Sequence, residues 1–414
     1  MGIVYEDAVV IKEADNKPGA PTEITVNCPD KTGLGCDLCR IILLFGLSIS
    51  KGDFQTDGKW CYIVFSVVGK PTTRWNLLKK RLQEACPSHL STSGLDYYQT
   101  EIKQAKPAAD VFLLKFWCRY DGKDFLHDVT EVLWALELTI RRVKVSTAPD
   151  GKVMDLLYVT DTRELLHTKD RQQDTIDHLT HVLGNSLLSC EIELAGPEVT
   201  ACVQGLSSLP SAISEDMFML ELPNKPNGLL VPVSVKADNS LSPAHTVVQI
   251  LCLDHKGLIY DTMRTLKDYN IQVSYGRFTV NKKGNCEIEL FTMQQTENKK
   301  IVDPSKQAAL CSRLRMELAR PLRIHVISRG PDTELLVSNP VEFSGRGRPL
   351  VFHDITLALK DLGIRIFSVE IWRTIIHNRE WEVYRILLDE SRGNPCARNK
   401  IEDCVRNKLL GWNY

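Results

Sequence analysis

The sequence has no excess of either charge and no long hydrophobic run. Its 414 residues carry 51 Lys and Arg against 52 Asp and Glu, which gives a net charge of −1. Proteins that bind nucleic acids or anionic membrane surfaces usually carry a clear positive surplus, so we expect neither partner. The best apolar run, Ile41–Ile49, falls far short of the roughly 20 residues that a membrane-spanning helix needs.

A regular cysteine pattern is also missing. The 13 cysteines are an odd number and lie scattered along the chain, which favours reduced thiols in a reducing compartment over a disulfide framework. The first ten residues, MGIVYEDAVV, contain no basic segment followed by an apolar stretch, so no secretory signal is predicted. We therefore expect a cytoplasmic protein, with the nucleus as a second location.

The sequence does contain an internal repeat. Four segments align without gaps, and they begin at residues 30, 121, 254 and 347. Each has an aspartate in the same place, namely Asp37, Asp128, Asp261 and Asp354. These aspartates are 91, 133 and 93 residues apart, which groups the four repeats into two closely spaced pairs.

Each repeat predicts the same order of elements. In the first repeat, Leu34, Leu38, Ile42 and Phe45 follow helical spacing, and residues 47 and 49 then alternate as in a strand. A strand-like run precedes each such helix, and a hairpin and a second helical stretch follow it. Final strands are predicted for the first three repeats near Asp96–Ile102, Cys190–Leu194 and Leu322–Ile327. This βαββαβ order is the ferredoxin-like plan, an α+β fold whose antiparallel sheets carry helices on one face.

The repeats define the domain organisation. We expect an N-terminal tail at residues 1–19, domains at 20–104, 107–195, 244–330 and 331–414, and a Pro- and Gly-punctuated connection at 196–243. Because each sheet would have a bare face, each domain needs a partner. We expect sequence neighbours to pair, first with second and third with fourth, and a homodimer through the sheets is a further option. The fourth repeat has almost no room for a last strand, so its sheet should be one strand short or be completed by Met217–Leu222 or Leu229–Val235.

The repeated loops resemble a known family. The run Asp254–Asp261 (DHKGLIYD) resembles the signature of the ACT domain, in the form found in plant ACT-domain-repeat (ACR) proteins and at the end of the bacterial protein-PII uridylyltransferase. Asp30–Leu34 (DKTGL) is similar, and the four-repeat arrangement resembles the ACR proteins over roughly residues 20–195 and 244–414. The resemblance implies small-molecule sensing, usually of amino acids, at an interface between domains near the strand-to-helix loop.

The candidate ligand site is the loop between the first strand and the first helix of a repeat. The first amides of a helix lack intrahelical partners and suit a carboxylate, and glycine lets a ligand approach the backbone. A plain tight turn with an Asp cap is the alternative. Asp124 and Leu350 replace this glycine in the second and fourth repeats. We therefore predict two ligand sites, with the binding residues Asp30, Thr32, Gly33, Leu34, Asp254, Lys256, Gly257 and Leu258.

Other chemistry is not predicted. His127-Asp128 and His353-Asp354 are similar to the His-Asp pair of metal-dependent phosphohydrolases. At the position of these histidines, the first and third repeats have Cys36 and Tyr260, so the repeat does not require histidine there. Because no further ordered ligands accompany the His-Asp pairs, we predict no metal site and no cofactor. Phosphate-binding loops and nucleophile elbows are absent, so we expect no enzymatic activity.

These observations lead to one functional expectation and two alternatives. We expect a non-catalytic regulatory protein that binds an amino acid or a related small metabolite and signals to a partner protein whose identity the sequence does not give. The first alternative is a protein–protein interaction scaffold with vestigial ligand loops. The second is a zinc or redox thiol protein that uses the cysteines of the first repeat, Cys28, Cys36, Cys39 and Cys61.

Overall fold

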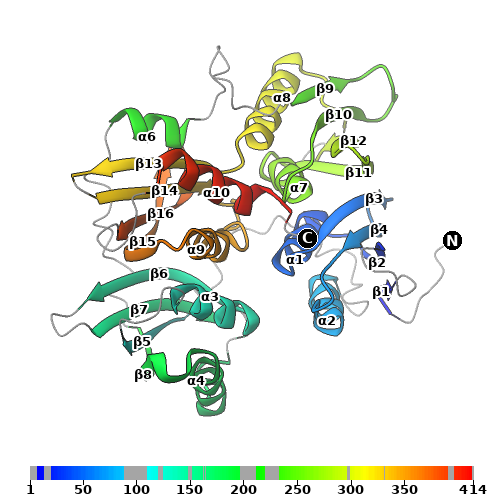
Figure 1. The fold of residues 1–414 in the computed structure, drawn as a ribbon. Helices are drawn as coiled ribbons and strands as arrows, with labels where there is room; N and C mark the ends of the chain where they lie inside the picture. Colours follow the sequence, from blue (N-terminus) through cyan, green and yellow to red (C-terminus); the bar gives the residue numbers. More distant parts are fainter. Residues whose placement is uncertain are drawn as a thin grey trace. The chain divides into compact units, whose positions relative to one another are not determined.

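The computed structural model describes residues 7–13, 20–87, 110–119, 125–147, 152–161, 163, 165–195, 211–219, 233–295, 299–330, 332–389 and 396–412. The chain forms two compact units (Figure 1). Unit 1 consists of Met1–Thr100, Met219–Pro321 and Leu410–Tyr414, and unit 2 of Glu101–Phe218 and Leu322–Leu409. Unit 1 therefore combines repeats 1 and 3, and unit 2 combines repeats 2 and 4. The prediction that sequence neighbours pair is wrong.

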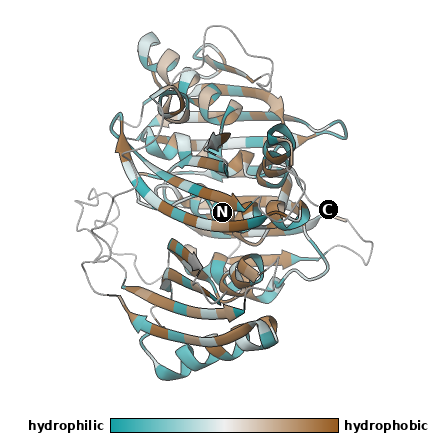
Figure 2. Cartoon of the chain, turned by 60° about the vertical axis from the view of Figure 1, so that its left-hand side comes forward, coloured by the Kyte–Doolittle hydropathy of each residue, from teal (hydrophilic) through white to brown (hydrophobic). Residues whose placement is uncertain are grey.

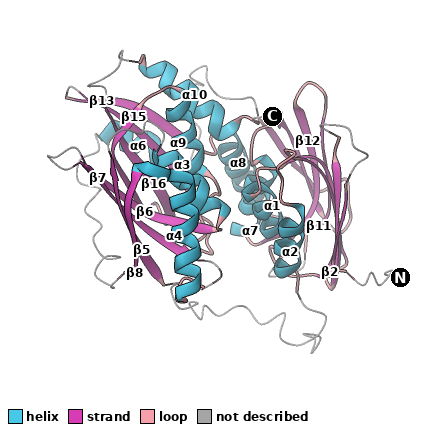
Figure 3. Cartoon of the chain, turned by 60° about the horizontal axis from the view of Figure 1, so that its bottom comes forward, coloured by secondary structure: helices cyan, strands magenta, loops and turns pink. Residues whose placement is uncertain are grey.

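Unit 1 is built on one antiparallel sheet of eight strands, four from each repeat. Its order is β1 (Val9–Lys12), β2 (Thr22–Pro29), β4 (Trp60–Val68), β3 (Ser48–Thr56), β11 (Ile271–Val280), β12 (Asn285–Gln294), β10 (Thr246–Leu253) and β9 (Ser234–Asp238). One face is covered by α1 (Leu34–Leu44), α2 (Trp75–Ala85), α7 (Leu258–Asp268) and α8 (Pro304–Ala319), as Figure 3 shows. Hydrophobic and hydrophilic residues alternate along the strands (Figure 2), and the apolar ones form a core shared by both repeats.

Two glycines allow β3 and β11 to join the two halves of this sheet. In the ladder, Gly52 lies opposite Phe278, and Gly276 lies opposite Phe54. A Cβ atom on Gly52 would lie 2.2 Å from the Phe278 ring, so glycine is required there. Between these pairs, Arg277 Nε donates to Asp53 Oδ1 at 2.7 Å. The repeats thus pair edge to edge through complementary strands, and not through the bare sheet faces.

Unit 2 keeps its two sheets separate. Repeat 2 forms β6 (Leu138–Thr147), β7 (Lys152–Asp161), β5 (Val111–Arg119) and β8 (Leu187–Leu194), and repeat 4 forms β13 (Arg323–Arg329), β14 (Asp332–Pro340), β16 (Arg379–Asp389) and β15 (Arg365–Ile376). Strands β6 and β15 lie side by side. The repeat spacing places Val143 and Val369, both buried, where unit 1 has its two glycines. The helices within the two repeats are α3 (Phe125–Ala135), α4 (Lys169–Leu183), α9 (Val351–Asp361) and α10 (Arg398–Leu410).

The repeats differ in the segment that supplies the edge strand beside the first core strand. Repeat 2 uses β8, which follows its second helix, as predicted from Cys190–Leu194. Repeats 1, 3 and 4 use a strand that precedes the core instead, namely β1, β9 and β13. The assignment of Leu322–Ile327 to repeat 3 is therefore wrong, because this segment forms a tight antiparallel hairpin with β14 of repeat 4. The Asp96–Ile102 prediction lies outside the described residues.

The sheet of repeat 4 is completed by another segment, as predicted, but neither Met217–Leu222 nor Leu229–Val235 supplies the strand. Strand β13 fills the position, while Met217 lies in α6 (Ser211–Phe218), which packs on β13. The second candidate, Leu229–Val235, overlaps β9 and serves repeat 3. The predicted fold class, α+β with ferredoxin-like antiparallel repeats, is confirmed. Within the described residues, no helix is long and apolar enough to cross a membrane.

Candidate functional site

The loop between β2 and α1 lines a cavity in unit 1. Gly33 precedes the helix in the left-handed conformation, with φ 75°, and Leu34 begins α1. Four predicted residues, Asp30, Thr32, Gly33 and Leu34, line a cavity of about 80 Å³. This is room for several water-sized groups, since one water needs about 10–15 Å³. The α1 end that faces the cavity carries the amides that lack intrahelical partners.

Repeat 3 forms the opposite wall of the cavity. The wall consists of Met263, Leu266 and Lys267 from α7, Ile271–Val273 at the start of β11, and Gln295 after β12. Apolar side chains from repeat 1, including Phe54 and Ile63 of β3 and β4, extend the lining. The cavity is therefore composite, and its polar groups come from both repeats.

Asp30 is the acidic group at the cavity. Its Oδ2 accepts a hydrogen bond from Thr56 Oγ1 at 2.6 Å. Burial raises the pKa of Asp30, and the hydrogen bond from Thr56 opposes that shift. Thr32 Oγ1 accepts from Gln295 Nε2 at 2.6 Å, which links the loop to repeat 3. A ligand ammonium group would find one carboxylate here that is held in place and partly shielded from water.

Two lysines provide positive charge beside the same helix end. Lys31 Nζ lies 3.2 Å from Asp37 Oδ2, and Lys267 Nζ lies 3.4 Å from Asp37 Oδ1. The Lys267 stem also packs against Gly33, since a Cβ atom there would lie 2.7 Å from Lys267 Cε. With two ammonium groups on one aspartate, the helix end retains a positive balance. The cavity thus offers cationic groups and a carboxylate at one place, as a zwitterion requires.

Sequence reasoning missed Lys267 and Gln295 because they come from repeat 3. A signal for Lys267 exists, however. Lys360 holds the same position in repeat 4, and its Nζ lies 2.8 Å from Asp128 Oδ1 in unit 2. Each unit therefore joins its two repeats through an equivalent Lys–Asp pair.

The second predicted loop is covered by the C-terminal segment of the chain. Trp412 Nε1 donates to Asp254 Oδ2 at 2.9 Å, and the amide of Lys256 donates to the Leu410 carbonyl at 2.8 Å. Burial raises the pKa of Asp254 to about 6. Gly257 has φ 83°, so the loop keeps the backbone of the first site, and Leu258 is buried. The Asp254 carboxylate and the Lys256 amide are thus engaged within unit 1.

The loops of the other repeats depart from this pattern. Asp124 lies outside the described residues. Leu350 adopts the left-handed conformation that glycine has in repeats 1 and 3, with φ 63°. The fourth loop therefore keeps the turn but places a bulky side chain at the glycine position.

Cys28, Cys36, Cys39 and Cys61 of repeat 1 are buried, and Cys86, whose pKa is lowered by its contact with Cys28, is half-buried. Cys28 and Cys61 face each other with their Sγ atoms 3.6 Å apart. The contact with Cys61 raises the pKa of Cys28, and burial raises that of Cys39. Thiols with raised pKa values are poor nucleophiles and poor metal ligands, because both roles need the thiolate.

Comparison with known proteins places the chain among ACT-domain proteins. Residues 11–87 match the N-terminal domain described for ACT domain-containing protein ACR10, residues 234–332 an ACR9-like, ACT-like domain, and residues 333–411 the C-terminal domain of ACR9. Arabidopsis thaliana ACR10 is 54% identical over 417 residues, and A. thaliana ACR9 is 52% identical over 425 residues, with each alignment covering 100% of both chains.

A partial similarity connects the chain to a bacterial enzyme. The bifunctional uridylyltransferase/uridylyl-removing enzyme of Azospirillum brasilense is 32% identical over 91 residues, which is 22% of this chain and 10% of the enzyme. Full-length similarity to ACR9 and ACR10, with family matches in three parts of the chain, decides the assignment. The chain belongs to the ACR family of ACT domain-containing proteins.

Proposed function

We propose that this protein is a non-catalytic sensor that binds a free amino acid, or a closely related zwitterion, in the unit 1 cavity. Membership of the ACR family gives the chain a regulatory ACT-domain role. The observation that supports the ligand class is the pairing of opposite charges at the cavity. The Asp30 carboxylate suits an ammonium group, while Lys31, Lys267 and the α1 amides suit a carboxylate.

The contacts of Lys267 suggest how a ligand changes the protein. Its ammonium group bonds Asp37 of repeat 1 while its backbone belongs to α7 of repeat 3. A ligand carboxylate competes with Asp37 for this ammonium group, so binding alters the contact between the repeats. A partner protein that binds the paired repeats would respond to this change in the contact between repeats 1 and 3.

We propose one ligand site per chain because the C-terminal segment covers the loop of repeat 3. Asp254 and Lys256 are engaged by Trp412 and Leu410, whereas the first loop opens into the cavity. The sequence alone predicts two sites. We propose one, in repeat 1, with the repeat 3 loop closed by the chain itself.

A thermal-shift screen of the full-length protein against the common amino acids tests the proposal. A ligand at 100 times its Kd stabilises the folded state by about 2.7 kcal/mol, which for a unit of this size raises Tm by roughly 5–10 °C. Titration calorimetry should then give one site per chain. If no amino acid shifts Tm, the sensor proposal fails, and the scaffold alternative is favoured.

A matched pair of variants localises the site. Lys267→Met keeps the aliphatic contact with Gly33 but removes the ammonium group, and should weaken binding at least tenfold, since a hydrogen bond to a charged group contributes about 1.5–3 kcal/mol. Lys360→Met removes the equivalent Lys–Asp pair of unit 2 and should leave affinity unchanged. Equal loss in both variants would mean that the effect is structural.

A further inference from the structure

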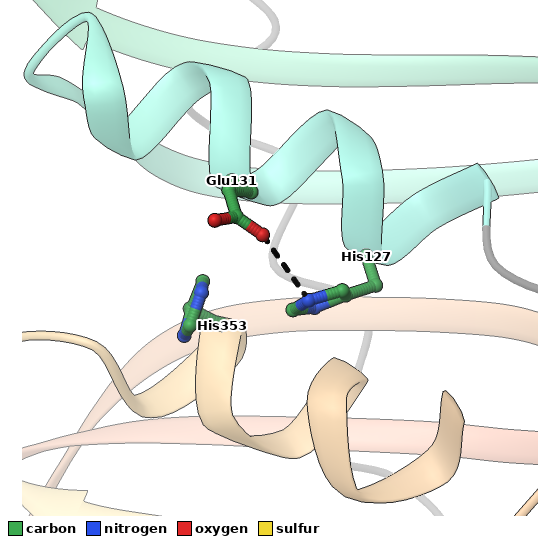
Figure 4. A group of neighbouring side chains, drawn as sticks. All are labelled: His127, Glu131 and His353. Atoms are coloured by element: carbon green, nitrogen blue, oxygen red, sulfur yellow. Dashed lines mark ion pairs between the residues drawn. The ribbon is translucent and has the colours of Figure 1, made fainter. Parts of the chain in front are cut away.

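A cluster of three metal-ligating side chains lies between the first helices of unit 2. Helix α3 supplies His127 and Glu131, and the start of α9 supplies His353 (Figure 4). One ligand atom from each residue lies within 4.8 Å of the other two. The repeats that supply them are 2 and 4, so the cluster exists because alternate repeats pair.

The spacing on α3 places two ligands on one helix face. His127 and Glu131 are four residues apart, which is about one helical turn. His127 Nε2 lies 3.5 Å from Glu131 Oε2. In a tetrahedral site with bonds of about 2.0–2.1 Å, neighbouring donor atoms lie roughly 3.3 Å apart. These two atoms are therefore already near the separation that a bound zinc ion requires.

Hydrogen bonds fix which nitrogen of His127 faces the cluster. The Thr356 hydroxyl donates to the His353 carbonyl at 2.9 Å, and the Thr130 hydroxyl donates to the His127 carbonyl at 2.7 Å. Both hydroxyl protons are thereby used. The Thr130 and Thr356 hydroxyls also lie 3.2 Å apart, and donation by Nδ1–H across the 3.1 Å contact between His127 Nδ1 and Thr356 Oγ1 is the arrangement that keeps both carbonyl bonds. This tautomer leaves the lone pair on Nε2, directed to the Glu131 side.

His353 has a comparable supporting contact. Its Nδ1 lies 3.3 Å from Asp354 Oδ1. A carboxylate on one ring nitrogen orients the imidazole and makes the other nitrogen a better ligand, as is common for metal-binding histidines. The two imidazole rings lie with their centroids 5.0 Å apart. Both histidines therefore have the outer contacts that a metal site uses.

The exposure of the three residues suits an open site. His127 is buried, His353 has 17% of its side chain exposed, and Glu131 has 58% exposed. A cation can thus arrive from solvent on the Glu131 side, and that carboxylate can move to close on it. Three protein ligands with one position left for water is the coordination of open zinc sites, and imidazole favours zinc over magnesium or calcium.

Unit 1 provides an internal comparison. The repeat spacing places Cys36, Arg40 and Tyr260 at the positions of the three ligands. An arginine in this set excludes a cation. Unit 1 joins its repeats by the β3–β11 ladder, whereas the repeats of unit 2 form separate sheets that touch along β6 and β15 without joining into one sheet, and their helices α3 and α9 also contact each other. A metal between these helices would supply a direct link between repeats 2 and 4.

From this geometry we propose that His127, Glu131 and His353 form a zinc-binding site that links repeats 2 and 4. The probe is Zn²⁺ itself, added to full-length protein stripped with a chelator and dialysed. We expect one ion per chain by titration calorimetry, and a rise in Tm on addition of zinc. Glu131→Gln, at an exposed position that leaves the fold intact, should weaken zinc binding at least tenfold. His353→Gln should abolish it.

The control must separate this site from the cysteines. Co²⁺ bound by nitrogen and oxygen lacks the sulfur-to-cobalt charge-transfer bands that a thiolate site shows, so its absorption spectrum identifies the ligands. His178→Gln, on the exposed face of α4, should bind zinc as the wild type does. Absence of binding at 100-fold molar excess of zinc, unchanged affinity in both Glu131→Gln and His353→Gln, or a thiolate cobalt spectrum would each overturn the proposal.

Discussion

Asp155 places an acid in the core of unit 2, and its replacement should stabilise the protein at neutral pH. The residue lies on β7, opposite Phe116 of β5 and Val145 of β6, and is 2% exposed. Within the described residues its Oδ1 has no hydrogen-bond partner. Burial raises the pKa of Asp155 to about 7 from the ordinary value of 3.8.

The sign and size of the effect follow from proton linkage. Because the folded pKa is raised, the folded state holds the proton more tightly than the unfolded chain, and stability falls as pH rises from about 4 to about 7. The shift lowers the free energy of unfolding by roughly 4 kcal/mol at pH 8 and by less than about 1 kcal/mol at pH 4. Asp155→Asn removes the ionisable group but keeps a polar side chain of the same shape. The free energy of unfolding of the variant should therefore be about 4 kcal/mol higher than that of the wild type at pH 8 and nearly equal to it near pH 4.

Calorimetric and denaturant unfolding between pH 4 and 8 measures this difference. The transition of unit 2 should move to higher temperature in Asp155→Asn at pH 8, by roughly 8–16 °C for a unit of this size. Asp174→Asn, at an exposed position on α4, is the control and should show no such gain. A constant difference between Asp155→Asn and the wild type across this pH range would refute the reasoning, because ionisation of Asp155 would then not be the cause.

Three further changes test the packing of unit 1. Gly52→Val places a side chain where Phe278 lies 2.2 Å from the Cβ position, so it should disrupt the β3–β11 ladder, and hydrogen exchange should report faster exchange of those amides. Trp412→Ala should uncover the repeat 3 loop and raise the ligand stoichiometry in calorimetry from one to two. Arg264→Met should lower the free energy of unfolding, measured with denaturant, by about 3 kcal/mol, because it breaks the buried 2.7 Å pair with Glu317 while Arg313, 2.5 Å from Glu317, still compensates that carboxylate in part.

The local structure of each repeat could be predicted from the sequence because local patterns determine it. The spacing of Leu34, Leu38 and Ile42 predicts a helix, and α1 covers Leu34–Leu44 with these residues buried. The change to alternating residues after Gly46 predicts the strand that begins at Ser48. Gly33 lies in the predicted turn between strand and helix, and it adopts the left-handed conformation there. Each of these features depends on residues within one or two turns of chain.

The origin of the edge strands could not be predicted from local patterns. A run such as Leu322–Ile327 has a strand composition whichever neighbour it joins. Its partner is decided by the short connection to β14, which allows a tight hairpin. The β8 strand of repeat 2 has no such competing hairpin among the described residues and was predicted correctly.

The pairing of alternate repeats likewise rests on contacts that no single repeat contains. Gly52 is explained only by Phe278, and Asp37 is explained only together with Lys267. In each case the two residues lie more than 220 positions apart in the chain. Taken alone, Asp37 in the first turn of α1 is explained by its favourable interaction with the helix dipole. In the structure it also anchors a lysine from the other repeat.

The candidate sites were hard to predict for the same reason, and they differ because the pairing contacts differ. Both units bring the first helices of two repeats together, α1 with α7 and α3 with α9, and both use a Lys–Asp pair there. In unit 1 the continuous sheet already joins the repeats, and a cavity remains between the α1 end and α7. In unit 2 the sheets are separate, and two histidines and a glutamate lie between the helices. Both units thus share the helix contact, while the residues that flank it differ: a cavity with charged groups of both signs in unit 1, and two histidines with a glutamate in unit 2.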